Sequence, residues 1–219
     1  MSLQTAPYLE QERRWPQEGR HILAQFSPDT VTVYQAYRPA IGHFAARHGR
    51  FGGEYSFARM SWIKPNFLWM MSRSGWGTKP DQEVTLALHL KREGFEALLA
   101  AAVASSFGAS GFETQETWAE AVKGSDVRLQ WDPDHGPKGE PLQRRAIQLG
   151  LRGAMLQHLN EEWLVGIDDI SAFVQAQRAH VSDLELLQTP REAVYAVQDQ
   201  DVARRIQVDL TSEIGRAHV

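Results

Sequence analysis

The amino-acid sequence predicts an α+β fold, with a mixed or antiparallel sheet and several packed helices in a single domain. Short β-type runs and amphipathic helical segments follow one another without the regular strand–helix–strand cadence of a doubly wound sheet. No composition break or Pro/Gly/Ser-rich linker divides the 219 residues. That length is ordinary for one domain, so residues 1–213 are interpreted as one unit.

The first half of the chain is predicted to begin with a hairpin. It joins His21–Phe26 to Val31–Tyr37 through Ser-Pro-Asp-Thr, because proline and aspartate favour turns between β-type runs. A helix then starts at Pro39, where proline suits the first turn, and ends before Gly49. The next expected elements are a strand over Phe57–Ile63, a short helix over Asn66–Ser72 and a period-two strand over Glu83–Leu90.

The second half is predicted to contain longer helices. Arg92–Ser105 is rich in alanine and leucine at helical spacing. Asp132–Gly136 has the composition of a turn, so the strand before it is expected to end at Trp131. The other expected elements are a helix around Trp118, strands over Val127–Trp131, Ala146–Leu151 and Glu192–Val197, and helices over Ala154–Leu164 and Ile170–Ala179.

Composition excludes several classes of protein. Cysteine is absent, which excludes thiol catalysis, disulfide frameworks, Cys-ligated zinc and iron–sulfur clusters. No apolar run approaches the roughly 20 residues that a membrane span requires, and the N-terminus lacks the apolar core of a signal peptide. We therefore expect a cytoplasmic protein with no membrane partner. The sequence specifies neither a cofactor nor an oligomeric state.

The last residues are interpreted separately. Residues 214–219, Ile-Gly-Arg-Ala-His-Val, match what one reading frame of a widely used short-read sequencing adapter encodes. Fusion scars of this kind are left out of fold reasoning. We therefore expect residues 214–219 to be a non-native tail.

The most distinctive segment of the sequence runs from Arg59 to Gly77. Residues 55–80 hold four basic residues and no acidic one, although the whole chain has a net charge of −4. Its Lys64-Pro65 pair lies where a strand meets a helix N-terminus, a place that favours anions. The segment suggests Arg59, Lys64 and Arg73 as contacts to a phosphate or carboxylate and Trp62 as a stacking platform, whereas the apolar run Phe67–Met70 is expected to be core.

A second cluster covers Gln130–His135 and Arg144–Gly150. It offers further ligand contacts in Gln130, Trp131 and Arg145. His135 or Asp132 would transfer protons there, since histidine titrates near neutrality, and Glu83 is a third candidate. Asp132, Asp134 and His135 also form an alternative metal-ligand set, although they lack the spacing of an EF-hand loop and a turn is the favoured interpretation.

Several known signatures are missing from the chain. It contains no G-x-G-x-x-G after a strand, no P-loop, no G-x-S-x-G and no H-E-x-x-H. Their absence disfavours dinucleotide-binding Rossmann, P-loop, serine-hydrolase and zincin readings.

These clusters also carry a resemblance to a known family. The run Arg59–Gly77 with Gln82-Glu83 resembles the signature of the family catalogued as domain of unknown function 4291. The resemblance extends over roughly residues 31–197 and continues at Gln35–Tyr37, Gln130–His135, Arg144–Arg152 and Ile167–Val174. It implies a soluble single-domain protein and assigns no catalytic residue. Ser72 stands where the family pattern has an aromatic residue.

Three functions remain open at this point. The first is an enzyme acting on a phosphate-bearing ligand, a nucleotide or a nucleic-acid end. Metal-independent group transfer such as ADP-ribosyl transfer belongs to this class, although its ordered set of catalytic residues is not identifiable here. The second is a non-catalytic module that binds a ligand or single-stranded nucleic acid, which the net charge does not favour. The third is a metal-dependent hydrolase at Asp132, Asp134 and His135. Alternatively, neither cluster is a functional site, and both are only core and turn structure.

Overall fold

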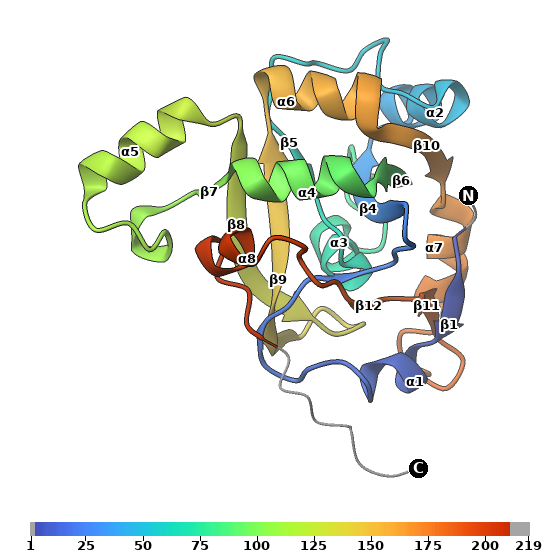
Figure 1. Ribbon diagram of the computed structural model, residues 1–219. Helices are drawn as coiled ribbons and strands as arrows, with labels where there is room; N and C mark the ends of the chain where they lie inside the picture. The colour runs from blue at the N-terminus through green and yellow to red at the C-terminus, as the bar shows by residue number, and fades with distance from the viewer. Residues whose placement is uncertain (1–2, 211–219) are drawn as a thin grey trace.

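Two sheets form the centre of the fold (Figure 1). The computed structural model describes residues 3–210. The first sheet is antiparallel and has the order β10 (Leu164–Asp169), β6 (Val84–Lys91), β4 (Thr30–Tyr37). The second is mixed, with the order β2 (Gly19–Arg20), β9 (Pro141–Leu151), β8 (Val127–His135), β7 (Ala102–Ala104), and with β5 (Ser61–Ile63) also paired to β9.

A single bridge between Tyr34 and Lys64 joins the two sheets. The Tyr34 backbone N–H donates to the Lys64 carbonyl at 2.7 Å, and the Lys64 N–H donates to the Tyr34 carbonyl at 3.2 Å. Tyr34 lies in the middle of β4, and Lys64 directly follows β5. The bridge therefore makes β4 and β5 neighbours and fixes the backbone of Lys64 through both its N–H and its carbonyl group.

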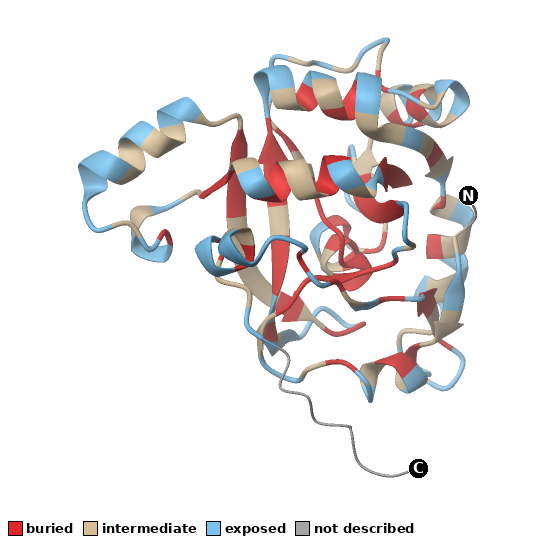
Figure 2. Ribbon diagram, in the orientation of Figure 1, coloured by how far each residue is buried: buried red, intermediate tan, exposed pale blue. Residues whose placement is uncertain are grey.

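Hydrophobic cores cover both faces of the first sheet. Val33 of β4 and Leu86 and Leu88 of β6 lie in the first core. Side chains of four further elements complete it: α2 (Pro39–His48), α4 (Arg92–Ala101), α6 (Gly153–His158) and the π-helical turn η2 (Leu159–Trp163). Tyr34 and Ala87 lie in the second core, which side chains of α3 (Phe67–Ser74) and α7 (Ser171–Arg178) complete. Figure 2 shows buried strands at the centre and exposed surface on the outer helices. This arrangement follows from the alternation of side chains along each strand.

The remaining elements lie around this centre. β1 (Thr5–Pro7) pairs with β11 (Gln188–Pro190), and β3 (Leu23–Ala24) pairs with β12 (Ala193–Val194). The N-terminal segment is therefore tied to the segment after α7. The other elements are α1 (Tyr8–Glu12), the short helix η1 (Phe107–Ala109), α5 (Gln115–Gly124) and α8 (Gln200–Arg205). No helix within residues 3–210 is long and apolar enough to cross a membrane.

The structure confirms the α+β class and several predicted elements. The helix from Pro39 ends with Gly49 in the left-handed region at φ 66°, as its glycine suggested. Asn66 caps α3 by accepting a hydrogen bond from the Trp69 backbone N–H, and the predicted period-two strand is β6. The tail predicted for residues 214–219 lies outside the described residues.

The predicted turn at Asp132–Gly136 is wrong. β8 continues through this segment to His135, and the turn lies at residues 136–140, where the Gly139 N–H bonds to the Gly136 carbonyl. Pro133 is tolerated because β7 pairs only with residues 127–129 of β8, so the strand is an edge at the position where proline lacks its N–H. Turn composition at this point was overridden by pairing with β9.

Other predicted boundaries also shift. The helix predicted over Arg92–Ser105 ends at Ala101, because the next three residues form β7 beside β8. The helix predicted over Ala154–Leu164 begins at Gly153 as α6, continues as a π-helical turn and stops where β10 begins. The strands predicted over His21–Phe26, Phe57–Ile63 and Glu192–Val197 shorten to β3, β5 and β12. In each case pairing with a distant strand sets the boundary.

A buried ion pair holds the β8–β9 hairpin close to its turn. Arg144 Nε donates to Asp134 Oδ2 at 2.7 Å, and the two side chains are 3% and 1% exposed. Arg144 also donates to the Pro16 carbonyl at 2.6 Å and lies over the Trp15 ring. Burial raises the pKa of Asp134, and the Arg144 guanidinium opposes that rise.

We predict that Arg144→Met lowers the free energy of unfolding by about 3–5 kcal/mol at pH 7, because it leaves Asp134 buried without a partner. The loss should shrink as the pH falls through the raised folded-state pKa of Asp134, since the protonated carboxyl carries no buried charge. Urea unfolding at pH 7 and pH 5 measures both effects. Arg152→Met, which removes the half-exposed pair with Asp126, is the matched control and should cost at most about 1 kcal/mol. Equal losses for the two variants would contradict the prediction.

Candidate functional site

A cavity of about 340 Å³ lies between α3 and one face of the β5–β9–β8 sheet. Its lining residues are Trp62, Lys64, Trp69, Arg73, Gln130, Asp132 and Gln148. Most of them belong to the two clusters that the sequence singled out, although almost 70 residues separate Lys64 from Asp132 in the chain. The cavity therefore brings parts of both clusters together.

Strand and helix periodicity explains why these side chains meet. Trp62 and Lys64 are two residues apart along β5 and its extension, and Gln130 and Asp132 are two apart on β8, so each pair shares a face. Gln148 of β9 lies directly opposite Gln130. On α3, Trp69 and Arg73 are four residues apart and lie on the same side of the helix.

A glycine makes room for the Trp62 ring. Trp62 and Gly150 are directly paired between β5 and β9. A Cβ at Gly150 would come within 2.7 Å of Met60 Sδ and 2.9 Å of carbon atoms of the Trp62 ring. The indole therefore lies against the bare backbone of β9 and forms one wall of the cavity.

Gln148 organises the polar wall of the cavity. Its Nε2 donates to Gln130 Oε1 and to Asp132 Oδ2, both at 2.8 Å. The Gln130 amide nitrogen has no partner within residues 3–210, so it is a free donor on this wall. Asp132 remains a negatively charged acceptor beside it.

Lys64 is the unusual charge in this cavity. Its side chain is only 5% exposed, and its ammonium group makes no hydrogen bond or ion pair within the described part of the chain. Burial, with a smaller contribution from the nearby Arg73, lowers the pKa of Lys64 to about 8, while Asp132 opposes the change. Arg73 is itself exposed and unpaired within residues 3–210. Two cations therefore line one cavity, and Asp132 is the one carboxylate among its lining residues.

His135 stacks on Trp69. The ring centroids are 4.8 Å apart and the planes differ by 5°. His135 Nδ1 and Trp69 Nε1 are both buried and find no hydrogen-bond partner in the described structure. Since His135 does not line the cavity, its contact with the site runs through the Trp69 ring.

Four residues predicted for the site lie elsewhere. Trp131 points to the opposite face of β8 from Gln130, packs against the first core and donates from Nε1 to the Ile206 carbonyl. Arg145 is exposed, and it lies on the opposite face of β9 from its buried neighbour Arg144. Glu83 accepts a hydrogen bond from the Asp81 N–H at 3.1 Å, at the turn before β6. Arg59 lines a separate cavity of about 290 Å³ with Tyr37, Ser61 and Asp81.

The alternative metal-ligand set does not converge. No group of three or more His, Asp or Glu side chains able to hold a metal ion is found within residues 3–210. Asp134 is bonded to Arg144 and to the His135 backbone N–H, and Asp132 is bonded to Gln148. His135 faces Trp69.

Two lining residues were not proposed from the sequence. Trp69 was assigned to the core together with Phe67, Leu68 and Met70, which are indeed buried in the second core. The Asn66 cap sets the phase of α3 and turns Trp69 toward the cavity, a signal that the sequence already contained. Gln148 could have been noticed as a polar residue in a strand of otherwise apolar or small residues.

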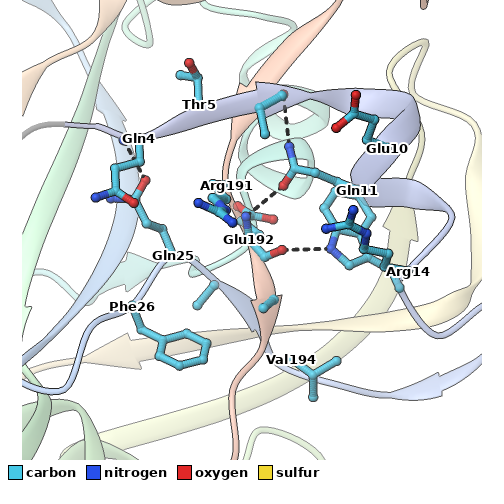
Figure 3. Close-up of a pocket in the computed structure, with 14 residues that line it drawn as sticks. Gln4, Thr5, Glu10, Gln11, Arg14, Gln25, Phe26, Arg191, Glu192 and Val194 are labelled. Atoms are coloured by element: carbon cyan, nitrogen blue, oxygen red, sulfur yellow. Dashed lines mark hydrogen bonds between the residues drawn. The ribbon is translucent and has the colours of Figure 1, made fainter. Parts of the chain in front are cut away.

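A larger cavity of about 640 Å³ lies between α1, β1 and β12, and Figure 3 shows its lining. Its buried polar groups mostly bond to one another. Gln11 Oε1 accepts from the Glu192 N–H at 2.8 Å, and Trp15 Nε1 donates to the Glu192 carbonyl at 3.0 Å. Gln25 Oε1 accepts from the Gln4 N–H. These bonds fasten the N-terminal segment to β12, and none of the chemistry predicted from the sequence lies here.

Comparison with known proteins places the chain in a family. Residues 21–195 match the family model described as Domain of unknown function (DUF4291), and the chain belongs to that family. The match includes every residue that lines the cavity of about 340 Å³ between α3 and the β5–β9–β8 sheet, which we call the Trp62–Lys64 cavity. No significant match is found among curated proteins.

We predict that Gly150→Ala displaces Trp62 and costs about 1–3 kcal/mol, because the added methyl group overlaps the indole and Met60. Near-ultraviolet circular dichroism reports the change in tryptophan packing, and urea unfolding reports the cost. Gly124→Ala is the control, since a Cβ there meets no atom within 4 Å. Identical spectra and stabilities for the two variants would contradict the assigned position of Trp62.

Proposed function

We propose that the Trp62–Lys64 cavity binds the phosphate of a nucleotide or of a phosphorylated nucleic-acid end. The observation that carries this proposal is the pair of cations, Lys64 and Arg73, that lines one cavity whose lining contains a single carboxylate, Asp132. Asp132 offsets only part of the cost of keeping a buried ammonium beside a guanidinium, and a ligand with negative charge would offset the rest. Phosphate does so and also accepts charge-assisted hydrogen bonds.

The rest of the cavity suits the remainder of such a ligand. Trp62 and Trp69 offer aromatic surfaces for a base. The free amide donor of Gln130 and the carboxylate of Asp132 can bond to ribose hydroxyls or to a base edge. A volume of about 340 Å³ is at the small end of ligand sites, which favours one nucleotide over a longer strand.

Proton transfer would fall to groups that reach the ligand. Asp132 and Lys64 line the cavity, whereas His135 would act by holding Trp69 in place. The proposal therefore keeps an enzyme, including metal-independent group transfer, ahead of a purely binding module. The net charge of −4 does not favour a module that tracks a long nucleic-acid backbone.

We predict that adenosine monophosphate binds and that adenosine binds at least about tenfold more weakly, because only the former engages Lys64 and Arg73. Lys64→Met and Arg73→Met should each weaken binding by about 10–100-fold, and Lys123→Met, on the exposed surface of α5, should not. Isothermal titration calorimetry measures these affinities.

A 5′-phosphorylated oligonucleotide in the same titration distinguishes the two sources of phosphate. Tighter binding of the oligonucleotide assigns a nucleic-acid end, and tighter binding of the mononucleotide assigns a free nucleotide. No binding of either at millimolar concentration would refute the proposal. Equal binding of an unphosphorylated oligonucleotide, with steep salt dependence, would indicate the non-catalytic nucleic-acid module instead.

We also predict that affinity for adenosine monophosphate falls as the pH rises from 7 to 9. Lys64 must be protonated to attract the phosphate, and its pKa in the free protein is lowered to about 8, so the ligand has to restore a proton above that pH. The phosphate itself keeps its charge over this range, because its second pKa is near 6. Lys64→Arg, which stays charged, should show almost no such dependence. A steep decline in that variant would contradict the role of Lys64.

A further inference from the structure

Lys64 differs from the other lysines of the chain. Lysine occurs at five positions, and the other four are on the surface: Lys79, Lys91, Lys123 and Lys138. Lys64 is 5% exposed, lines the cavity and lacks any partner within residues 3–210. Its backbone N–H and carbonyl are both bonded to Tyr34, and Pro65 follows it, so the start of its side chain is rigidly placed.

A phosphate clamp by itself does not require a buried lysine. The exposed guanidinium of Arg73 already supplies a permanent positive charge at the cavity. Placing an amine in a desolvated position next to another cation instead favours its neutral form, which is the nucleophilic one. Asp132 lines the same cavity and is held by Gln148, so a group able to exchange protons lies beside the amine.

We propose that Lys64 is an amine nucleophile that condenses with the carbonyl carbon of a phosphorylated sugar in its open-chain form. This inference rests on the proposed phosphate binding in the same cavity. In the reaction the neutral amine adds to the C=O bond and gives a carbinolamine. Uptake of one proton from solvent and loss of the carbonyl oxygen as water then leave a protonated C=N bond between Lys64 and the ligand, and no oxidant or reductant is consumed.

The neighbouring side chains match the parts of such a ligand. Arg73 binds its phosphate. Asp132 accepts a proton from the adding amine and passes it to the carbonyl oxygen, and a second proton, taken up from solvent, converts the departing hydroxyl group into water. The free amide of Gln130 and the oxygen of Gln148 can bond to the hydroxyl groups of the sugar chain. The ligand class is therefore a sugar phosphate with a free carbonyl carbon, including a nucleotide-linked ribose whose first carbon is free.

The test is reductive trapping with ribose 5-phosphate and cyanoborohydride on the full chain at pH 7, followed by peptide mapping. The reductant converts each C=N bond into a stable amine, and the four surface lysines serve as internal controls.

Lowering the pKa to about 8 increases the neutral fraction of Lys64 on the order of a hundredfold over an ordinary lysine. The weaker nucleophilicity of a less basic amine offsets part of this gain, as it does for thiols. We expect Lys64 to be modified about tenfold faster than the surface lysines.

Controls separate this inference from the proposed function. Inorganic phosphate should slow the modification of Lys64, ribose without phosphate should modify it less, and Lys123→Arg should leave its rate unchanged. Modification spread evenly over all five lysines, or sparing Lys64 while adenosine monophosphate still binds, would overturn the inference and leave the proposed function standing. Equal modification by ribose and ribose 5-phosphate would overturn the phosphorylated ligand class. Absence of both phosphate binding and modification of Lys64 would refute the inference and the proposed function together.

Discussion

Two backbone hydrogen bonds between Tyr34 and Lys64 connect the halves of this protein, and the cavity is built at that connection. On one side, β4 belongs to the antiparallel sheet that carries both hydrophobic cores. On the other, β5 continues into the mixed sheet through β9. Because both the N–H and the carbonyl of Lys64 bond to Tyr34, the sheet fixes the backbone position of Lys64 independently of its side chain. A lysine can therefore be held in a buried place that its charge disfavours.

The β8–β9 hairpin supplies the opposite wall, and its register decides which residues belong to it. One face carries Gln130, Asp132 and Gln148 toward α3, while the other carries Leu129 and Trp131 toward the first core. A slip by one residue would exchange these two sets. The buried pair of Asp134 and Arg144 secures the register near the turn of the hairpin.

The cavity concentrates features that stability alone would not select. Lys64 is buried without a partner, and the stacked rings of Trp69 and His135 each keep a buried nitrogen without one in the described structure. Unsatisfied buried groups of this kind cost about 1–3 kcal/mol each. Asp134 and Arg144, only a few residues away, are fully paired, so the fold was able to satisfy buried charge where a ligand was not required. This contrast is the reason why we propose a bound anion beside Lys64.

Local sequence determined what depends on neighbours along the chain. The cap at Asn66, the helix after Pro39, the alternation of β6 and the grouping of cations near Lys64 all rest on spacing of a few residues. The tertiary structure decided what depends on distant pairing. It extended β8 through a segment with turn composition, separated Trp131 and Arg59 from the cavity and added Trp69 and Gln148 to it. The reason is physical: a strand's partner fixes which face each side chain takes, and that partner lies many residues away in the chain.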